Sequence, residues 1–173
     1  LHKAIRRQRQ MCIRDRDYEC ELAVVLGRDA RDVPAGQTRD YIFGYTILND
    51  VSARDVQTAH KQWYFGKSLD GFTPIGPCIV TADAFADYPP RLGIRSFVNG
   101  EKRQDSNTAL QIFDIDHVIA ELSQGMTLKA GTIIATGTPA GVGMGMDPPQ
   151  FLKPGDVVRC EIDGIGALTN PVK

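Results

Sequence analysis

The chain has 173 residues, of which 42% are hydrophobic and 24% are charged, and its formal net charge at pH 7 is −1. This length suits one domain with a core of its own, and no apolar run approaches the roughly 20 residues that span a bilayer. The four cysteines form no CxxC pair, which argues against a zinc site or a disulfide framework and favours a cytoplasmic protein without a membrane partner.

The first sixteen residues differ in charge from the rest of the chain. They hold six of the 20 lysines and arginines and one of the 21 acidic residues, which leaves 14 basic and 20 acidic residues downstream. Because Met11-Cys-Ile-Arg-Asp-Arg16 resembles translated sequencing adapter, we expect residues 1–16 to be non-native, with a genuine disordered basic tail as the alternative. Residues 17–173 are then expected to be an N-terminally truncated domain. Nothing downstream interleaves basic and aromatic residues, so no nucleic-acid partner is expected.

Strand patterns dominate the chain. The clearest is a hairpin formed by residues 91–98 and 101–104, because Asn99-Gly100 suits a type I′ turn. The other predicted strands cover residues 19–26, 41–48, 78–81 (short and buried), 128–134, 157–162 and the residues after Gly164.

Two short helices are predicted among the strands. Residues 52–64 have near-helical apolar spacing, with Ser52 as the N-cap and Asp55 completing a weak capping box, and residues 116–124 form the second helix. Residues 66–77 are punctuated by Gly and Pro and predict a loop. Since βαβ units do not alternate regularly, the expected fold class is α+β, mainly β.

Two glutamates one residue apart, Glu19 and Glu21, open the first strand pattern. Side chains alternate along a strand, so both project from the same face, and burying them costs several kcal/mol each unless a cation meets them. Asp50, just after the second strand, offers a third carboxylate. An all-oxygen set suits Mg²⁺, Mn²⁺ or Ca²⁺. The alternative is that both glutamates lie on a solvated strand face.

Two further polar features, Lys67 and the segment 136–139, each have two possible interpretations. Lys67, between Gly66 and Ser68, is either a solvated loop lysine or functional. The segment 136–139, Thr-Gly-Thr-Pro, is either a structural turn or a nest of backbone N–H groups for an anion. His60 and His117 are interpreted as surface or packing residues. P-loop and Gly-x-Ser-x-Gly motifs are absent from the sequence.

Taken in order, these residues resemble the fumarylacetoacetate hydrolase family, and the resemblance runs from Asp17 to the C-terminus. The motifs that carry it are Asp17-Tyr-Glu-Cys-Glu-Leu-Ala-Val-Val-Leu-Gly27, Gly44-Tyr-Thr-Ile-Leu-Asn-Asp-Val-Ser-Ala-Arg-Asp55 with Gln57, Gly66-Lys-Ser-Leu-Asp70, Pro74-Ile-Gly-Pro77, Val98-Asn-Gly100 with Arg103-Gln104, and Thr136-Gly-Thr-Pro-Ala-Gly-Val-Gly143.

The resemblance implies a mixed β-sandwich roll, usually in homodimers, that binds Mg²⁺ or a similar cation through carboxylates. The implied metal ligands are Glu19, Glu21 and Asp50. We interpret Lys67 and Thr138 as catalytic, and the implied substrate-binding residues are Arg54, Gln57 and Gly137.

The resemblance also implies the chemistry. A 2-oxo or 2,4-diketo acid would chelate the cation, which stabilises the negative charge of an enolate as a Lewis acid, with support from Lys67 and Thr138. The leading hypothesis is a metal-dependent hydrolase that cleaves C–C bonds in acylpyruvate-like 2,4-diketo acids. The alternatives are an isomerase or decarboxylase of 2-oxo-dienoic acids and, in a different class, a non-catalytic metal-binding or oligomerisation domain. Hydrolysis needs a general base, and the His-Glu pair that the family commonly supplies from an N-terminal segment has no match here.

Overall fold

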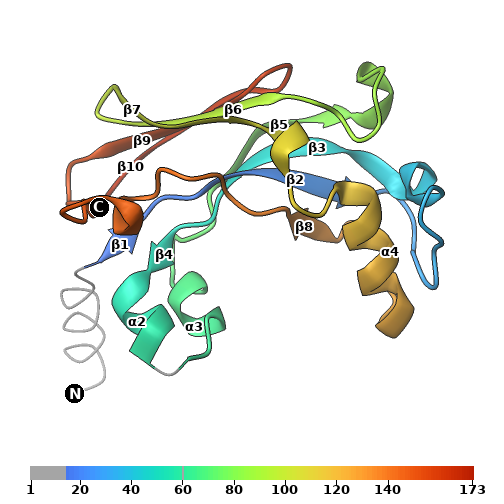
Figure 1. Cartoon of the computed structure of the whole chain (residues 1–173), viewed down its shortest axis with the longest axis horizontal. Helices are drawn as coiled ribbons and strands as arrows, with labels where there is room; N and C mark the ends of the chain where they lie inside the picture. The colour runs from blue at the N-terminus through green and yellow to red at the C-terminus, as the bar shows by residue number, and fades with distance from the viewer. Residues whose placement is uncertain (1–14, 60) are drawn as a thin grey trace.

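The structure is a computed structural model that describes residues 15–59 and 61–173. Within these residues, two four-stranded antiparallel sheets lie face to face, with the helices at the ends and below (Figure 1). One sheet has the order β10-β9-β6-β7, the other β5-β3-β2-β8, and a short third sheet joins β1 to β4. The strands are β1 (Arg16–Asp17), β2 (Cys20–Leu26), β3 (Ile42–Asn49), β4 (Ser52–Ala53), β5 (Ile75–Thr81), β6 (Gly93–Val98), β7 (Glu101–Asn107), β8 (Ile133–Ala135), β9 (Val157–Ile162) and β10 (Gly166–Pro171).

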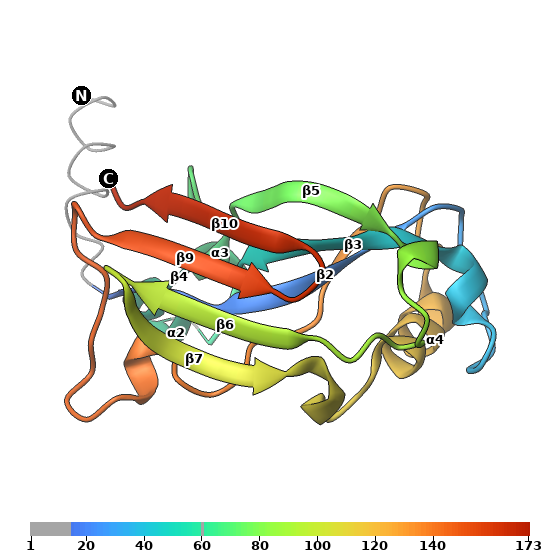
Figure 2. The ribbon, with the colours of Figure 1, turned by 90° about the horizontal axis from the view of Figure 1, so that it is seen from above.

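The expected fold class, a mainly β, α+β sandwich, is therefore confirmed. Seen from above, the strands of the β10-β9-β6-β7 sheet run side by side across the other sheet (Figure 2). The predicted β6–β7 hairpin is present: Asn99 and Gly100 have φ angles of 53° and 84°, as a type I′ turn requires.

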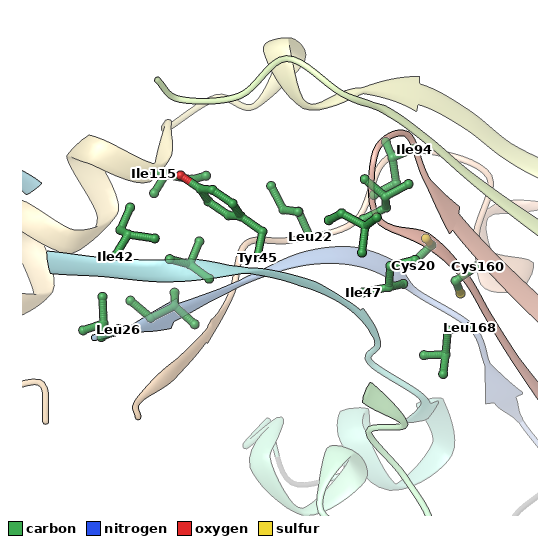
Figure 3. Packing of buried hydrophobic residues seen from close by; sticks show 14 of the residues in the cluster. Cys20, Leu22, Leu26, Ile42, Tyr45, Ile47, Ile94, Ile115, Cys160 and Leu168 are labelled. Carbon is green, nitrogen blue, oxygen red and sulfur yellow. The ribbon is translucent and has the colours of Figure 1, made fainter. Parts of the chain in front are cut away.

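The core fills the space between the two sheets. Leu22 and Tyr45 of the β5-β3-β2-β8 sheet face Ile94 of the β10-β9-β6-β7 sheet (Figure 3). Ile115 and Ile119 of helix α4 (Ile115–Gly125) belong to the same buried cluster. Each fully buried side chain of this kind contributes about 1.5–3 kcal/mol relative to an exposed one. The core thereby fixes β2 rigidly in the middle of its sheet.

Two thiols meet inside this core. Cys20 of β2 and Cys160 of β9 lie close together between the sheets (Figure 3), and both are buried and unoxidised. A hydrogen bond with Cys160, together with burial, raises the pKa of the Cys20 thiol far above its ordinary value. Cys20 is therefore a packing residue with an unreactive thiol, although it lies between Glu19 and Glu21 in the sequence.

Helix α4 confirms the predicted helix over residues 116–124 and extends it by one residue at each end. Asp114 is its N-cap, and its carboxylate accepts a hydrogen bond of 2.8 Å from the backbone N–H of His117. None of the helices in the described part of the chain is long and apolar enough to cross a membrane.

The prediction of one helix over residues 52–64 is wrong at its start and in its continuity. Ser52 and Ala53 form β4, because they pair with Asp17 and Arg16 of β1. The Ser52 hydroxyl donates to the Asp50 carbonyl instead of capping a helix. The helical residues form two pieces, α2 (Arg54–Ala59) and α3 (Tyr64–Lys67).

Three further boundaries differ from the predictions. The predicted loop 66–77 has its first residues in α3 and its last in β5. The strand predicted at 78–81 exists within the edge strand β5, but it is mostly exposed rather than buried, with Val80 half-buried against the core. The strand predicted at 128–134 is reduced to β8 and a single bridge between Ala30 and Leu128.

The predicted non-native segment, residues 1–16, lies outside the described residues except for Asp15 and Arg16. These two are part of the fold: the Asp15 carbonyl accepts a hydrogen bond from the Arg54 N–H, and Arg16 pairs with Ala53 and bridges to Leu152. The boundary at residue 17 stays a prediction.

Candidate metal centre and active site

Three carboxylates converge at the end of β2 nearest to α2 and α3. Glu19 directly precedes β2, Glu21 is its second residue, and Asp50 directly follows β3, which pairs with β2. One oxygen from each of the three carboxylates lies within 4.8 Å of the others. Glu19 and Glu21 are 7% and 3% exposed, which excludes the solvated strand face as an alternative. The structure thus brings together the three residues predicted to bind metal.

Lys67 reaches this cluster from the C-terminal end of α3. Its ammonium nitrogen lies 2.7 Å from Glu19 Oε2 and also contacts Asp50 Oδ2. Burial disfavours the charge on this ammonium, but the hydrogen bonds to Asp50 and Glu19 outweigh that effect, so the pKa of Lys67 is raised above its ordinary value. Lys67 is therefore a cation at neutral pH, and its alternative interpretation as a solvated loop lysine is wrong.

Arg54, the first residue of α2, is held by two carboxylates. Its guanidinium contacts Asp17 at 2.9 Å and Glu19 Oε1 at 2.6 Å, and its Nη1 donates to Gln57 Oε1 at 3.0 Å. Asp17 is fully buried and also accepts hydrogen bonds from the backbone N–H groups of Gly143 and Met144. Arg54 thus links β1, β2 and α2 around Glu19, and a direct contact between Arg54 and a substrate stays a prediction.

The Thr136–Pro139 segment lies along the other side of β2. The backbone N–H of Gly137 donates to Glu21 Oε2 at 2.8 Å, so one carboxylate of the cluster is oriented by this loop. The hydroxyl of Thr138 donates to the Cys20 carbonyl at 2.9 Å. A hydroxyl donates only one hydrogen bond, so donation from Thr138 to a substrate would require this bond to be broken.

Burial, above all, raises the pKa of Glu21 from 4.5 to about 7; the neighbouring Asp50 and Glu19 charges add to the rise, whereas the Gly137 N–H and Lys67 oppose it. Four carboxyl groups, including Asp17, face two cationic side chains at this end of β2. When all are ionised, an excess of two negative charges remains. A hard divalent cation fits this site, because its donors are all carboxylate oxygens and its charge would balance the excess.

The structure also bears on the two histidines and on residues that the sequence analysis did not select. His117 is exposed and stacks on the exposed Phe113 with ring centroids 4.7 Å apart, in agreement with the prediction of a surface or packing residue, whereas His60 lies outside the described residues. Two residues were missed: Asp17, which holds Arg54, and Gln104, whose Nε2 donates to Thr138 Oγ1. Asp17 shares the alternating spacing of Glu19 and Glu21, and that signal could have found it. Gln104 was noticed only within a family motif.

Comparisons with known proteins agree with this geometry. The family model described as fumarylacetoacetate (FAA) hydrolase C-terminal matches residues 2–173. The chain is 49% identical over 156 residues to oxaloacetate tautomerase YisK of Bacillus subtilis (strain 168), covering 90% of this chain and 52% of that protein. The chain therefore spans about half the length of the curated relatives that it matches.

Solved structures give the same result. A fumarylacetoacetate hydrolase from Exiguobacterium antarcticum is 50% identical, with a TM-score of 0.91 over 95% of this chain and 58% of that one. Fumarylpyruvate hydrolase from Pseudomonas aeruginosa, solved with Mn²⁺ and pyruvate, is 30% identical, with a TM-score of 0.81 over 90% of this chain and 65% of that one. The chain belongs to the fumarylacetoacetate hydrolase family.

Proposed function

We propose that this chain forms the cation-binding and substrate-binding part of an enzyme that moves a proton on a 2-oxo acid through its enolate. The leading reaction is keto–enol tautomerisation of an oxaloacetate-like acid. The observation that carries this proposal is the cluster of Glu19, Glu21 and Asp50 oxygens within 4.8 Å, with the Lys67 ammonium against it. The relative that is 49% identical and named as an oxaloacetate tautomerase supports the choice of substrate.

The proposed roles follow from charge and donor capacity. Glu19, Glu21 and Asp50 would hold Mg²⁺ or Mn²⁺, which as a Lewis acid stabilises negative charge that develops on a substrate oxygen. Lys67 is a half-buried ammonium, so it supplies a fixed positive charge and, beside its bonds to Glu19 and Asp50, one further N–H donor for an enolate oxygen. Its raised pKa keeps Lys67 protonated and therefore favours an electrostatic role over proton transfer.

Gln57 is the proposed contact to the substrate in α2. Its Oε1 accepts a hydrogen bond from Arg54, so the orientation of its amide is set and the NH₂ group is left as the donor. Gln57 is 6% exposed, and its helix borders the carboxylate cluster through Arg54. A donor held in this way suits a carboxylate or keto oxygen of the acid, and Arg54 would act by orienting Glu19 and Gln57.

Hydrolysis of C–C bonds in 2,4-diketo acids is the second candidate. Two structural neighbours are named as hydrolases, and one of them was solved with Mn²⁺ and pyruvate, a 2-oxo acid. Both reactions need the same stabilised enolate, so both would use the same carboxylates and Lys67. They differ in that hydrolysis also requires an activated water molecule.

The experiment uses the purified chain, first treated with EDTA and then supplied with Mn²⁺. Conversion of enol-oxaloacetate to the keto form is followed by ultraviolet absorbance, and acylpyruvate cleavage is measured in parallel. We expect Mn²⁺-dependent acceleration of tautomerisation that Lys67→Met reduces at saturating substrate. Tautomerisation that is unaffected by both EDTA and Lys67→Met would contradict the proposal. Cleavage alone would favour the second candidate.

We also propose a homodimer. The β5-β3-β2-β8 sheet exposes apolar side chains on three of its four strands: Phe43 of β3, Ile79 of β5 and Ile133 of β8 are each about half exposed. Exposed apolar groups of this kind commonly mark a protein interface. Multi-angle light scattering is expected to give twice the mass of the chain, and Ile79→Lys to give the mass of one chain. A monomeric wild type at high concentration would exclude the dimer.

A further inference from the structure

The edge of β2 that faces β8 changes its partners at Ala135. Between Ala23 and Val25, β2 pairs with the backbone of β8, and β8 ends at Ala135. Backbone groups of β2 beyond that point are buried and still need hydrogen-bond partners. The cation site lies in this part of β2, so whatever replaces β8 also determines how Glu19 and Glu21 are held.

Just beyond Ala135, the backbone N–H of Thr136 still donates to the Leu22 carbonyl at 3.2 Å, and side chains supply further bonds to β2. Thr136 Oγ1 donates to the Leu22 carbonyl at 2.8 Å, and Thr138 Oγ1 donates to the Cys20 carbonyl at 2.9 Å. The Cys20 N–H donates to Oε1 of Gln104 at 3.1 Å. Gln104 comes from β7, which belongs to the opposite sheet, so this contact crosses the core.

Both the oxygen and the nitrogen of the Gln104 amide form hydrogen bonds. While its Oε1 accepts from Cys20, its Nε2 donates to Thr138 Oγ1 and to the Pro139 carbonyl, both at 2.8 Å. Gln104 has no exposed surface. The buried Gln104 side chain therefore links two parts of the site. One is the β2 backbone at Cys20, between Glu19 and Glu21; the other is the Thr136–Pro139 loop, whose Gly137 N–H donates to Glu21.

The backbone of β7 is shaped for this task. In the pairing of β6 with β7, Ser96 lies opposite Gln104 and Phe97 opposite Lys102, so Arg103 is an extra residue and forms a bulge. A bulge re-aims the neighbouring side chain, here Gln104, into the core. Gly141 passes directly over the bulge: a Cβ at this residue would lie 2.2 Å from the Arg103 carbonyl oxygen, and its φ is +107°. The loop is thus held closely against Arg103 and Gln104.

We propose that Gln104 is a positioning residue of the cation site, which fixes Glu21 through the Thr136–Pro139 loop and through the β2 backbone. This inference rests on the proposed cation site. Replacing a group that orients a metal ligand commonly lowers metal affinity about 10–100-fold. Gln104→Met removes the donors and the acceptor at similar volume, and Gln104→Glu keeps the acceptor but removes the donors.

The matched control is Thr108→Val. Thr108 follows β7 directly, is also buried, and also joins two backbone groups, since its Oγ1 donates to Pro90 and accepts from the Leu92 N–H. It lies at the opposite end of β7 from the turn and has no contact with the cation site among its hydrogen bonds. A similar loss of stability is therefore expected without an effect on the cation site.

The test is calorimetric titration of each purified variant with Mn²⁺ alone, at a temperature where the variant is folded. We expect both Gln104 variants to bind about 10–100-fold more weakly than the wild type and Thr108→Val to bind equally well. Glu21→Ala separates the two proposals: unchanged affinity in Glu21→Ala would overturn the cation site itself. Weak binding in Glu21→Ala with unchanged binding in Gln104→Met would overturn only the positioning role. Failure of both Gln104 variants to fold, with Thr108→Val folded, would reduce Gln104 to a structural residue and overturn the inference.

Discussion

The two faces of β2 are both buried, but by different means. On one face, Leu22, Val24 and Leu26 belong to the buried apolar cluster. On the other face, Glu19 contacts Lys67 and Arg54, and Glu21 accepts a hydrogen bond from the backbone N–H of Gly137. The first face stabilises the fold through its burial. The second face keeps an excess of carboxylates, which costs stability until a divalent cation balances it.

The core face gives the largest expected change in stability. Leu22→Ala should lower the free energy of unfolding by about 2–5 kcal/mol, because Leu22 is fully buried in the cluster between the sheets. Urea denaturation followed by circular dichroism measures this loss. The Mn²⁺ affinity of the folded Leu22→Ala variant should stay near the wild-type value. If Leu22→Ala abolished Mn²⁺ binding, as Glu21→Gln is expected to do, the two faces of β2 would not have separate roles.

Glu21, on the face of β2 that carries the carboxylates, should make the free energy of unfolding fall as the pH rises. Ordinary paired carboxylates have the opposite effect. The pKa of Glu21 is about 7 in the folded state against 4.5 for the free group, so the folded state binds more protons between these values. Without a divalent cation, stability should therefore fall as the pH rises from 4.5 to 7, by up to roughly 3 kcal/mol. Urea denaturation in EDTA across this range measures the slope, and Glu21→Gln should flatten it. An equal slope in Glu21→Gln would assign the effect to another group.

The smallest expected difference in stability is between alanine substitutions of two adjacent valines, one on each face of β2. Val24 faces the core and has no exposed surface, whereas Val25 lies on the other face beside the half-exposed Ile133 of β8. Val24→Ala should cost about 2 kcal/mol and Val25→Ala slightly less, because Val25 is 7% exposed and is not part of the core cluster. Thermal unfolding of the two variants checks the order. A clearly larger cost at Val25 than at Val24 would contradict this order of the two faces.

Much of the fold could be predicted from local patterns. The alternation in residues 19–26 and the Asn99-Gly100 turn fix β2 and the β6–β7 hairpin, because these signals depend on neighbours in the sequence. Ser52 shows where such reasoning ends. Its sequence favours a helix N-cap, but it pairs with Asp17, 35 positions earlier, and only the folded chain contains that partner.

The site was predictable where its chemistry is unusual. Two glutamates on one strand face need an explanation, and so the carboxylate cluster could be proposed from the sequence. Gln104 could not, because a glutamine in the polar strand 101–107 gives no sign of burial. Its inward direction depends on the bulge at Arg103, which only the pairing with β6 reveals.

The most direct test of the account is the binding of Mn²⁺ to the carboxylate cluster. Calorimetric titration at pH 8 should give one Mn²⁺ per chain in the wild type and in Glu101→Gln, a matched change at a glutamate whose side chain is 69% exposed. The same titration of Glu21→Gln should show no saturable binding, because a neutral amide replaces a buried ligand whose carboxylate is ionised at this pH. Equal affinity in Glu21→Gln and the wild type would contradict the proposed metal centre.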